Sequence, residues 1–252
     1  MRKVILPVFM LVLAAGPTPG AEPLTRAAVE SLAARYRFFV VLEPTAKKPL
    51  RYVYADVGQH IHVVALKDGK MTPEWDSVGL GSQITSFFVK DVDLDGTMEI
   101  VVSTLQGRVL AYDADDYSLT FENMLREFKT ITCMVAANID NDPQDEVIFL
   151  ADSRLQVFDA LTRRQEWETS ENYTATMMLV ANVDEDEQLE IILNTGVVID
   201  SRFRNLDIAI PQAFAPRIAL QDLNNDGIPE VIGELPDFSL KIFDLRTRRE
   251  IW

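Results

Sequence analysis

Few residues suited to catalysis or cross-linking occur in this 252-residue sequence, which contains one cysteine and two histidines. A single cysteine excludes an internal disulfide, and Cys133 lies in an apolar stretch where we expect a small buried side chain. Histidine is the usual general base near neutral pH, and only His60 and His62 could serve. Nucleophile motifs and glycine-rich phosphate loops are also absent from the sequence. We therefore expect a protein that is not an enzyme.

Positive charge is scarce as well. The chain has 24 Lys and Arg residues against 39 Asp and Glu residues, so its formal net charge is −15. Such a surface repels nucleic acid and anionic lipid, and we expect neither as a partner. Hydrophobic residues make up 48% of the chain, which predicts a folded domain with a substantial core.

The sequence lacks any apolar run long enough to span a membrane. Its one long run, Val4 to Ala15, follows two basic residues and precedes small residues up to Ala21. That layout predicts a signal peptide over 1–21; the alternative, a membrane anchor, needs a longer run. We expect export to the periplasm or cell exterior, with no membrane span after cleavage. Apolar residues at helical spacing predict a short helix over 22–36.

An acidic loop occurs four times, starting at Asp91, Asn138, Asn182 and Asp222, which are 47, 44 and 40 residues apart. Each copy has Asp or Asn at its first and third positions, Asp at its fifth, Glu at its ninth, and then Ile or Val. A strand-like run follows each loop, and in several copies an aromatic residue comes eight positions after the end of that run, as from Asp113 to Phe121. The repeat therefore extends well beyond the loop.

Each repeat is best interpreted as four short strands, because its residues alternate between apolar and polar and include many β-branched side chains. A period of about 40 to 45 residues with four strands is typical of a propeller blade. We predict an all-β fold, a β-propeller of about five four-stranded blades over 37–252. The predicted blades are 37–77, 78–126, 127–171, 172–213 and 214–252, and the first has no acidic loop.

The four loops resemble those of the FG-GAP or VCBS repeat family, whose blades occur in integrin-α heads and in many secreted bacterial proteins. The segments "FDALTRRQEW" and "FDLRTRREIW" are also similar to closing strands of quinoprotein-type propellers, the class that includes the outer-membrane assembly scaffold BamB. Resemblance to the first family implies that a loop between the first and second strands of a blade can bind calcium.

Calcium takes six to eight oxygen ligands, which a short loop supplies by turning alternate residues inward. Two loops have glycine, Gly96 or Gly227, at the sixth position, where the chain must bend sharply. The predicted ligands in these loops are Asp91, Asp93, Asp95, Thr97, Glu99, Asp222, Asn224, Asp226, Ile228 and Glu230. Pro143 and Glu187 take the sixth position in the other two loops, which we expect to be poorer sites.

Alternative interpretations exist for several of these residues. The Asp and Asn side chains could simply cap turns through hydrogen bonds to the backbone. His60 and His62 could form a weak metal pair, although an ordinary strand surface is the better interpretation. The residues Trp75, Trp167 and Trp252 share one blade position; stacking on sugars is an alternative to the packing between blades that we expect.

These observations favour an exported, non-enzymatic scaffold that binds another protein and contains structural calcium. One alternative is a calcium-dependent adhesion or carbohydrate-binding module with a glycan ligand. A second alternative is an enzyme acting on polysaccharide through paired carboxylates, which an acidic sequence alone does not exclude.

Overall fold

The computed structural model describes residues 35–67, 70–140 and 142–252. The signal peptide predicted over 1–21, and nearly all of the helix predicted over 22–36, lie outside the described residues. Among the described residues, no helix is long and apolar enough to cross a membrane.

Twenty strands form within the described residues, and they make five antiparallel sheets of four strands each. The predicted all-β fold is confirmed. Each sheet falls within one predicted blade range, and its strands are hydrogen-bonded in chain order. The first sheet contains β1 (Phe38–Leu42), β2 (Arg51–Ala55), β3 (Ile61–Lys67) and β4 (Lys70–Asp76). The second contains β5 (Ile84–Lys90), β6 (Glu99–Thr104), β7 (Val109–Asp113) and β8 (Leu119–Glu122).

The remaining three sheets repeat the same order. The third sheet contains β9 (Ile131–Ala137), β10 (Glu146–Ala151), β11 (Arg154–Asp159) and β12 (Gln165–Glu168). The fourth contains β13 (Met178–Ala181), β14 (Glu190–Leu193), β15 (Val197–Asp200) and β16 (Asn205–Ala209). The fifth contains β17 (Ile218–Gln221), β18 (Glu230–Glu234), β19 (Leu240–Asp244) and β20 (Arg249–Glu250).

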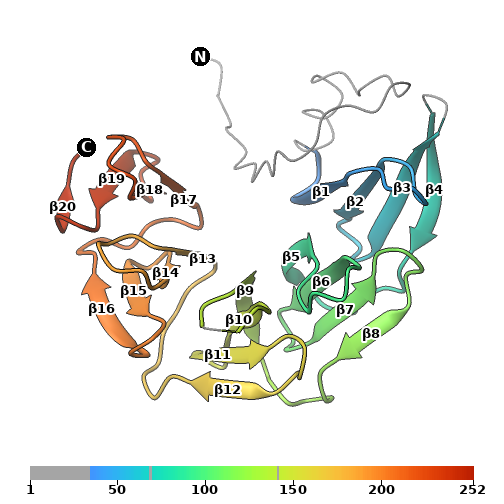
Figure 1. The fold of residues 1–252 in the computed structure, drawn as a ribbon, viewed down its shortest axis with the longest axis horizontal. Coiled ribbons are helices and arrows are strands. Elements are labelled where there is room, and N and C mark those ends of the chain that lie inside the picture. The colour runs from blue at the N-terminus through green and yellow to red at the C-terminus, as the bar shows by residue number, and fades with distance from the viewer. Residues whose placement is uncertain (1–34, 68–69, 141) are drawn as a thin grey trace. The chain divides into compact units, whose positions relative to one another are not determined.

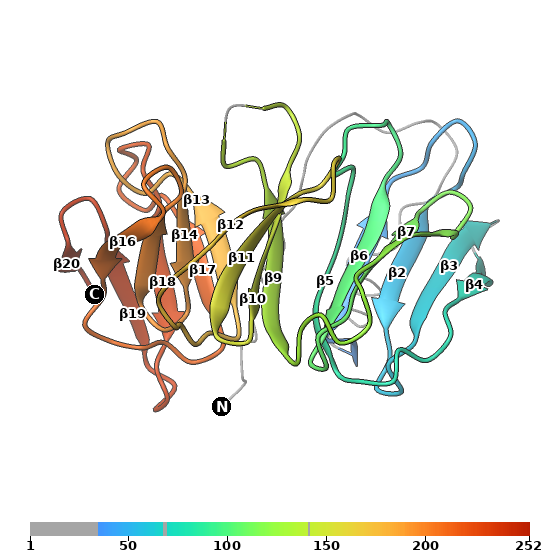
Figure 2. The same ribbon diagram turned by 90° about the horizontal axis from the view of Figure 1, so that it is seen from below.

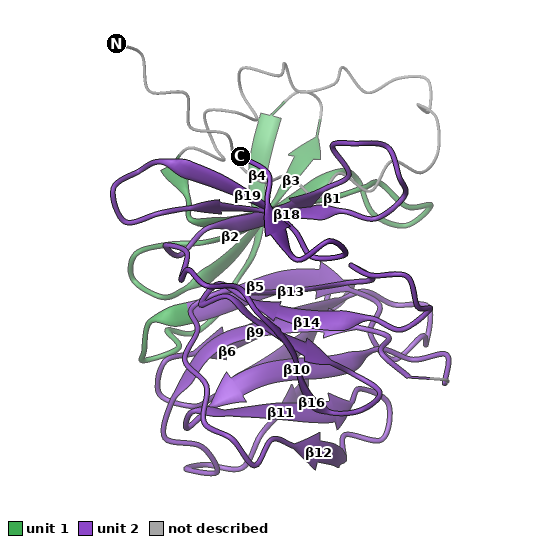
Figure 3. Ribbon diagram, turned by 90° about the vertical axis from the view of Figure 1, so that its left-hand side faces the viewer, with its two compact units in different colours: residues 1–84 green, residues 85–252 purple. Residues whose placement is uncertain are grey.

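The chain divides into two compact units, residues 1–84 and residues 85–252, which Figure 3 shows in different colours. Unit 1 contains the first sheet, in which β3 alternates between buried and partly exposed positions. Ile61 and Val63 of β3 are fully buried, and Tyr52 of β2 is 1% exposed. This alternation is the pattern expected of a strand with one face in a core.

In unit 2 the sheets bury their faces on one another. One apolar cluster joins the second and third sheets, another the third and fourth, and a last one the fourth and fifth. The first strands of these sheets lie on the inner side of the unit and the fourth strands on the outer side (Figure 1). The backbone N–H of Met134 in β9 donates to Ser86 Oγ of β5 at 2.8 Å, which links two inner strands. Unit 2 therefore has the packing of propeller blades.

The acidic loops join the first and second strands of their sheets, as the sequence predicts. Because the sheets share one strand order, the four loops lie at the same end of unit 2 (Figure 2).

The tryptophans follow the packing prediction only in part. Trp167 of β12 is 8% exposed and packs in the cluster between the third and fourth sheets. Trp252 is instead 65% exposed, so for this residue the prediction is wrong. The fourth strand of this sheet, β20, has only two residues and ends at Glu250, so Trp252 lies outside the strand.

Candidate functional site

The ninth residue of each acidic loop is a glutamate that begins the second strand of its sheet and is almost completely buried. Each glutamate accepts a hydrogen bond from the backbone N–H of the second loop residue, seven positions earlier. The donors and distances are Val92 to Glu99 at 3.0 Å, Ile139 to Glu146 at 2.7 Å, Val183 to Glu190 at 2.9 Å and Leu223 to Glu230 at 2.7 Å. One carboxylate oxygen of each glutamate therefore holds the loop closed.

Aspartates and asparagines within the loops also bind the backbone. The side chain at the third position accepts the N–H of the fifth residue, and the fifth side chain accepts the N–H of the seventh. In the first loop, Asp95 Oδ1 accepts from Thr97 N at 2.7 Å. Turn capping, the alternative interpretation of these residues, therefore takes place in the loops, but it uses only some of the available oxygens.

Three loops bring carboxylates together so closely that one oxygen of each residue lies within 4.8 Å of the others. The first group is Asp91, Asp93 and Glu99. The second is Asp140, Asp142, Glu146 and Glu166, and the third is Asp184, Asp186 and Glu190. Two of the three groups thus belong to the loops that lack the glycine.

Each group contains a buried carboxylate oxygen that has no hydrogen-bond partner among the described residues. These atoms are Asp91 Oδ1, Glu146 Oε1 and Glu190 Oε1, and both glutamates are 0% exposed. A buried, unpaired carboxylate oxygen is costly unless a proton or a cation offsets its charge. Each of the three groups therefore has oxygen atoms that could bind a cation, and a buried negative charge that a cation would offset.

The same crowding affects proton binding. Burial is the main cause that raises the pKa of Glu99 to about 7, and the neighbouring aspartates add to the rise. Burial and nearby carboxylates likewise raise the pKa of Glu146 to about 7 and that of Glu190 to about 8. In each case the hydrogen bond from the loop backbone acts in the opposite direction.

The loops close in two different ways. In the two glycine loops, Gly96 and Gly227 have φ of 90° and donate N–H to the first aspartate, at 3.1 Å and 2.9 Å. In the other two, the amide of Asn138 donates to the Asp142 carbonyl at 2.6 Å, and Asn182 donates to the Asp186 carbonyl. Asparagine at the first position therefore closes a loop without glycine, so glycine is not required to gather carboxylates.

The loop at Asp222 does not bring its carboxylates together in this way. Nη2 of Arg246 lies 2.8 Å from Asp226 Oδ2, and the amide of Asn224 donates to Asp226 at 3.2 Å and to Glu230 at 2.7 Å. A guanidinium and an amide thus already supply positive charge and hydrogen bonds to this loop. The predicted ligands Asp222, Asn224, Asp226, Ile228 and Glu230 form no carboxylate cluster among the described residues.

Glu166 is a member of the second group that sequence reasoning missed. It lies in β12, the outer strand of the sheet, about twenty residues beyond the loop. Burial, followed by the charges of Asp140 and Asp159, raises the pKa of Glu166. No spacing rule within the loop could reveal this residue, because only the sheet brings β12 near the loop.

His62 lies between two carboxylates of unit 1. Its Nδ1 is 2.6 Å from Asp76 Oδ1, its Nε2 is 3.2 Å from Asp56 Oδ2, and its ring stacks on Tyr54 with centroids 4.9 Å apart. Burial alone would lower the pKa of His62, but hydrogen bonds and charges from Asp76 and Asp56 outweigh burial and raise it. Both ring nitrogens are thus engaged by acids, an arrangement that suits an imidazolium ion and not a metal ligand.

Comparison with known proteins identifies the fold. No protein-family model matches the sequence, and no curated protein matches it. Among solved structures, BBS1N in complex with ARL6DN has a TM-score of 0.59 at 12% identity, and this chain is covered over 85% of its length. The match spans 64% of the BBS1N chain.

Two bacterial structures are also similar. BamB from Moraxella catarrhalis has a TM-score of 0.52 at 14% identity, with 80% of this chain and 57% of BamB covered. The V. cholerae biofilm matrix protein Bap1 has a TM-score of 0.58 at 15% identity, with 85% of this chain and 38% of Bap1 covered. At these identities the likeness shows a propeller-like fold and does not identify the FG-GAP or VCBS family.

Proposed function

We propose that this chain is a non-enzymatic β-propeller scaffold that binds another protein and contains calcium in its acidic loops. The observation that carries the proposal is the use of the clustered carboxylates. In the described part of unit 2 most of them lie in or at the end of strand-to-strand loops, where they accept backbone N–H groups and lie close to one another. A carboxylate pair held in this way is poorly placed to act on a substrate.

A protein partner is consistent with the similar structures. BBS1N was crystallised in complex with ARL6DN, so a propeller-like chain of this kind can present a surface to a second protein. Propellers also serve many other functions, so the fold by itself does not decide the role. The amino-terminal sequence supports export to the periplasm or to the outside of the cell.

Calcium fits the three carboxylate groups because each offers several hard oxygen donors within 4.8 Å of one another. The oxygens of Glu146 and Glu190 that have no partner would face the ion, while their second oxygens keep the loop closed. A bound cation would supply the positive charge that these groups lack. Its effect would be structural, since it would fix the connection between the first two strands of a blade.

Affinity capture of the exported protein, with and without a calcium chelator, tests the proposal. We expect one stoichiometric protein partner, with weaker recovery in the chelator if the calcium loops stiffen the binding surface. Recovery of a glycan alone, or turnover of a polysaccharide by the purified protein, would contradict the scaffold function.

Calcium-dependent adhesion is a second candidate. Bap1, one of the similar structures, is a biofilm matrix protein, and the exposed Trp252 offers an aromatic surface of the kind that stacks on sugars. If this candidate is correct, calcium and a glycan together should raise the melting temperature more than calcium alone. Replacing Trp252 by Ala should then remove the glycan effect only.

A further inference from the structure

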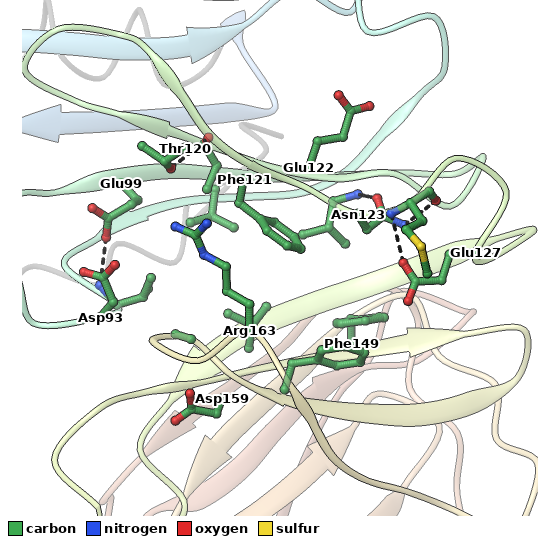
Figure 4. Close-up of a pocket in the computed structure, with 18 of the residues that line it drawn as sticks. Asp93, Glu99, Thr120, Phe121, Glu122, Asn123, Glu127, Phe149, Asp159 and Arg163 are labelled. Carbon is green, nitrogen blue, oxygen red and sulfur yellow. Dashed lines mark hydrogen bonds between the residues drawn. The ribbon is translucent and has the colours of Figure 1, made fainter.

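An apolar cavity of about 250 Å³ opens between the second and third sheets of unit 2. Phe121 from β8 and Phe149 from β10 line it (Figure 4). Two further phenylalanines, Phe158 from β11 and Phe128 from the segment before β9, also line it. Phe149 is 3% exposed, whereas the other three are only partly buried and belong to the edge of the core cluster. The cavity is therefore the open outer end of the core between two blades.

The aromatic wall is an ordered arrangement. The rings of Phe149 and Phe158 stack with centroids 5.4 Å apart, and Phe128 meets Phe149 edge-on at 5.2 Å. Such pairs fix ring orientation, so the wall is formed before anything enters. Exposed apolar residues continue from the cavity into the β8–β9 segment, where Met124 and Leu125 are 74% and 83% exposed.

The volume restricts what can enter. Pockets for drug-sized ligands begin at about 300 Å³, so this smaller cavity suits a single large side chain. Aromatic walls favour an aromatic guest, because offset and edge-on ring contacts add to the apolar area that is buried. Interfaces commonly place an aromatic anchor of one partner into such a pocket of the other.

The charges around the cavity favour a basic guest segment. Five carboxylates are among the described lining residues, namely Asp93, Glu99, Glu122, Glu127 and Asp159. Asp93 and Glu99 belong to the first carboxylate group, where a bound calcium ion would offset their charge, so the other three give the rim its negative charge. Glu122 is paired with Arg108, whereas the exposed Glu127 accepts a backbone N–H from Met124 at 3.1 Å. With a net charge of −15 on the whole chain, positive residues beside an aromatic anchor would be attracted to this rim.

Arg163 is the one cation among the described residues that line the cavity. Its guanidinium carbon lies 5.6 Å from the centroid of Phe121, over the ring (Figure 4). An aromatic side chain that enters beside Phe121 would meet the same guanidinium, which is a favourable cation–π contact. Arg163 therefore supports an aromatic guest, while its charge offsets one of the carboxylates of the rim.

We propose that this cavity binds an aromatic side chain of a partner protein, in a segment where Lys or Arg residues flank the aromatic residue. The proposal rests on the scaffold function and names one surface that the scaffold uses. A second copy of this chain is a poorer guest, because two chains of net charge −15 repel each other.

The test uses a peptide, Lys-Lys-Phe-Lys-Lys, whose phenylalanine ring has a fluorine label that is followed by NMR during titration with the whole protein. We expect saturable binding that shifts and broadens the fluorine signal. Replacing the aromatic residue by alanine, or the lysines by glutamates, should weaken binding at least tenfold. The alanine peptide has no labelled ring, so its binding is measured by competition with the labelled peptide. Equal binding of the alanine peptide would show charge attraction alone and overturn the proposal.

Two variants locate the peptide. Ala111 lines the cavity from β7 and is 8% exposed, so Ala111→Leu should fill the space and weaken binding at least tenfold. Glu127→Lys on the exposed rim should weaken binding severalfold even if Ala111→Leu folds poorly. Glu171→Lys makes the same charge change elsewhere in unit 2 and should have no comparable effect. Unchanged binding by both cavity variants would overturn the proposal.

The remaining outcomes distinguish the proposed guest from other guests. They also distinguish a failure of this inference from a failure of the scaffold function. If toluene binds the cavity more tightly than the peptide does, or if the protein self-associates through this face, the proposed guest is wrong. If affinity capture recovers a partner that the Ala111→Leu and Glu127→Lys variants still bind fully, the scaffold function stands and this inference fails. If the peptide binds as expected but capture recovers no protein, the scaffold function fails instead.

Discussion

Arg246 and Asp226 form an ion pair, with Nη2 and Oδ2 2.8 Å apart, in the only acidic loop of the described chain whose carboxylates do not cluster. A second guanidinium nitrogen of Arg246 lies 3.7 Å from Glu185 in the neighbouring loop. The arginine thus supplies the positive charge in the fifth sheet, whereas we propose that an ion supplies it in the other three loops.

Replacing Arg246 by Gln should therefore create a calcium site at the Asp222 loop. Because the ion pair is partly exposed, its loss should cost no more than about 1 kcal/mol of stability without calcium. Calorimetry should then count one more calcium per chain than in the original protein. Arg248→Gln, which removes a similar pair with Asp207, is the control and should leave the count unchanged.

Glu146→Gln should separate the two functions of the loop glutamate. Glutamine can still accept the N–H of Ile139, but it removes the buried charge. In calcium-free buffer at pH 8 we expect the variant to be more stable by about 1 to 3 kcal/mol, since one pKa unit corresponds to about 1.4 kcal/mol. With calcium present it should bind one ion fewer.

Denaturant melts with and without a chelator measure both effects of that substitution. Glu168→Gln, in the same sheet but half-exposed and paired with Arg154, is the matched control. A Glu146→Gln protein that is less stable than the original in chelator would show that the carboxylate is not under charge repulsion.

His62 predicts a pH dependence for the stability of unit 1. Because its folded pKa is raised above the ordinary value of 6.5, the stabilisation is complete below about pH 6.5 and is lost as the pH rises through the folded pKa. The difference in melting temperature between the original protein and His62→Gln should therefore shrink on going from pH 6 to pH 9. Asp76→Asn should move that decline to lower pH, and a difference that stays constant would contradict the assignment.

Trp167→Ala should cost about 3 to 5 kcal/mol, because it opens a cavity in the cluster between the third and fourth sheets. Trp252→Ala should change stability by less than about 0.5 kcal/mol, because that side chain is 65% exposed. Urea melts of the two variants test whether packing between sheets, and not blade position alone, sets the role of each tryptophan.

Much of the fold can be predicted from the sequence because the loop motif and the strand pattern repeat together. The predicted second blade, 78–126, contains the four strands β5 to β8, and Phe121, the aromatic residue of its repeat, lies in β8. The loop motif, with Glu at its ninth position before a β-branched residue, also places Glu99 at the start of β6, where its side chain closes the loop.

The candidate site is harder to predict, because its decisive contacts come from distant strands. Glu166 reaches its carboxylate group from β12, and Arg246 reaches Asp226 from the turn after β19. The glycine rule predicts poorer calcium sites in the loops at Asn138 and Asn182. Carboxylates nevertheless lie close together in both, because these asparagines close their loops by another hydrogen bond. Residue spacing within a loop contains none of this information.

The number of calcium ions bound per chain, measured by titration calorimetry on chelator-treated protein, tests the proposed calcium sites most directly. We predict three ions, one for each carboxylate group, and a rise in melting temperature as they bind. At 100 times the dissociation constant, each site should add about 2.7 kcal/mol of stability. A protein that takes up no calcium, and whose melting temperature is the same with calcium or chelator, would contradict the account.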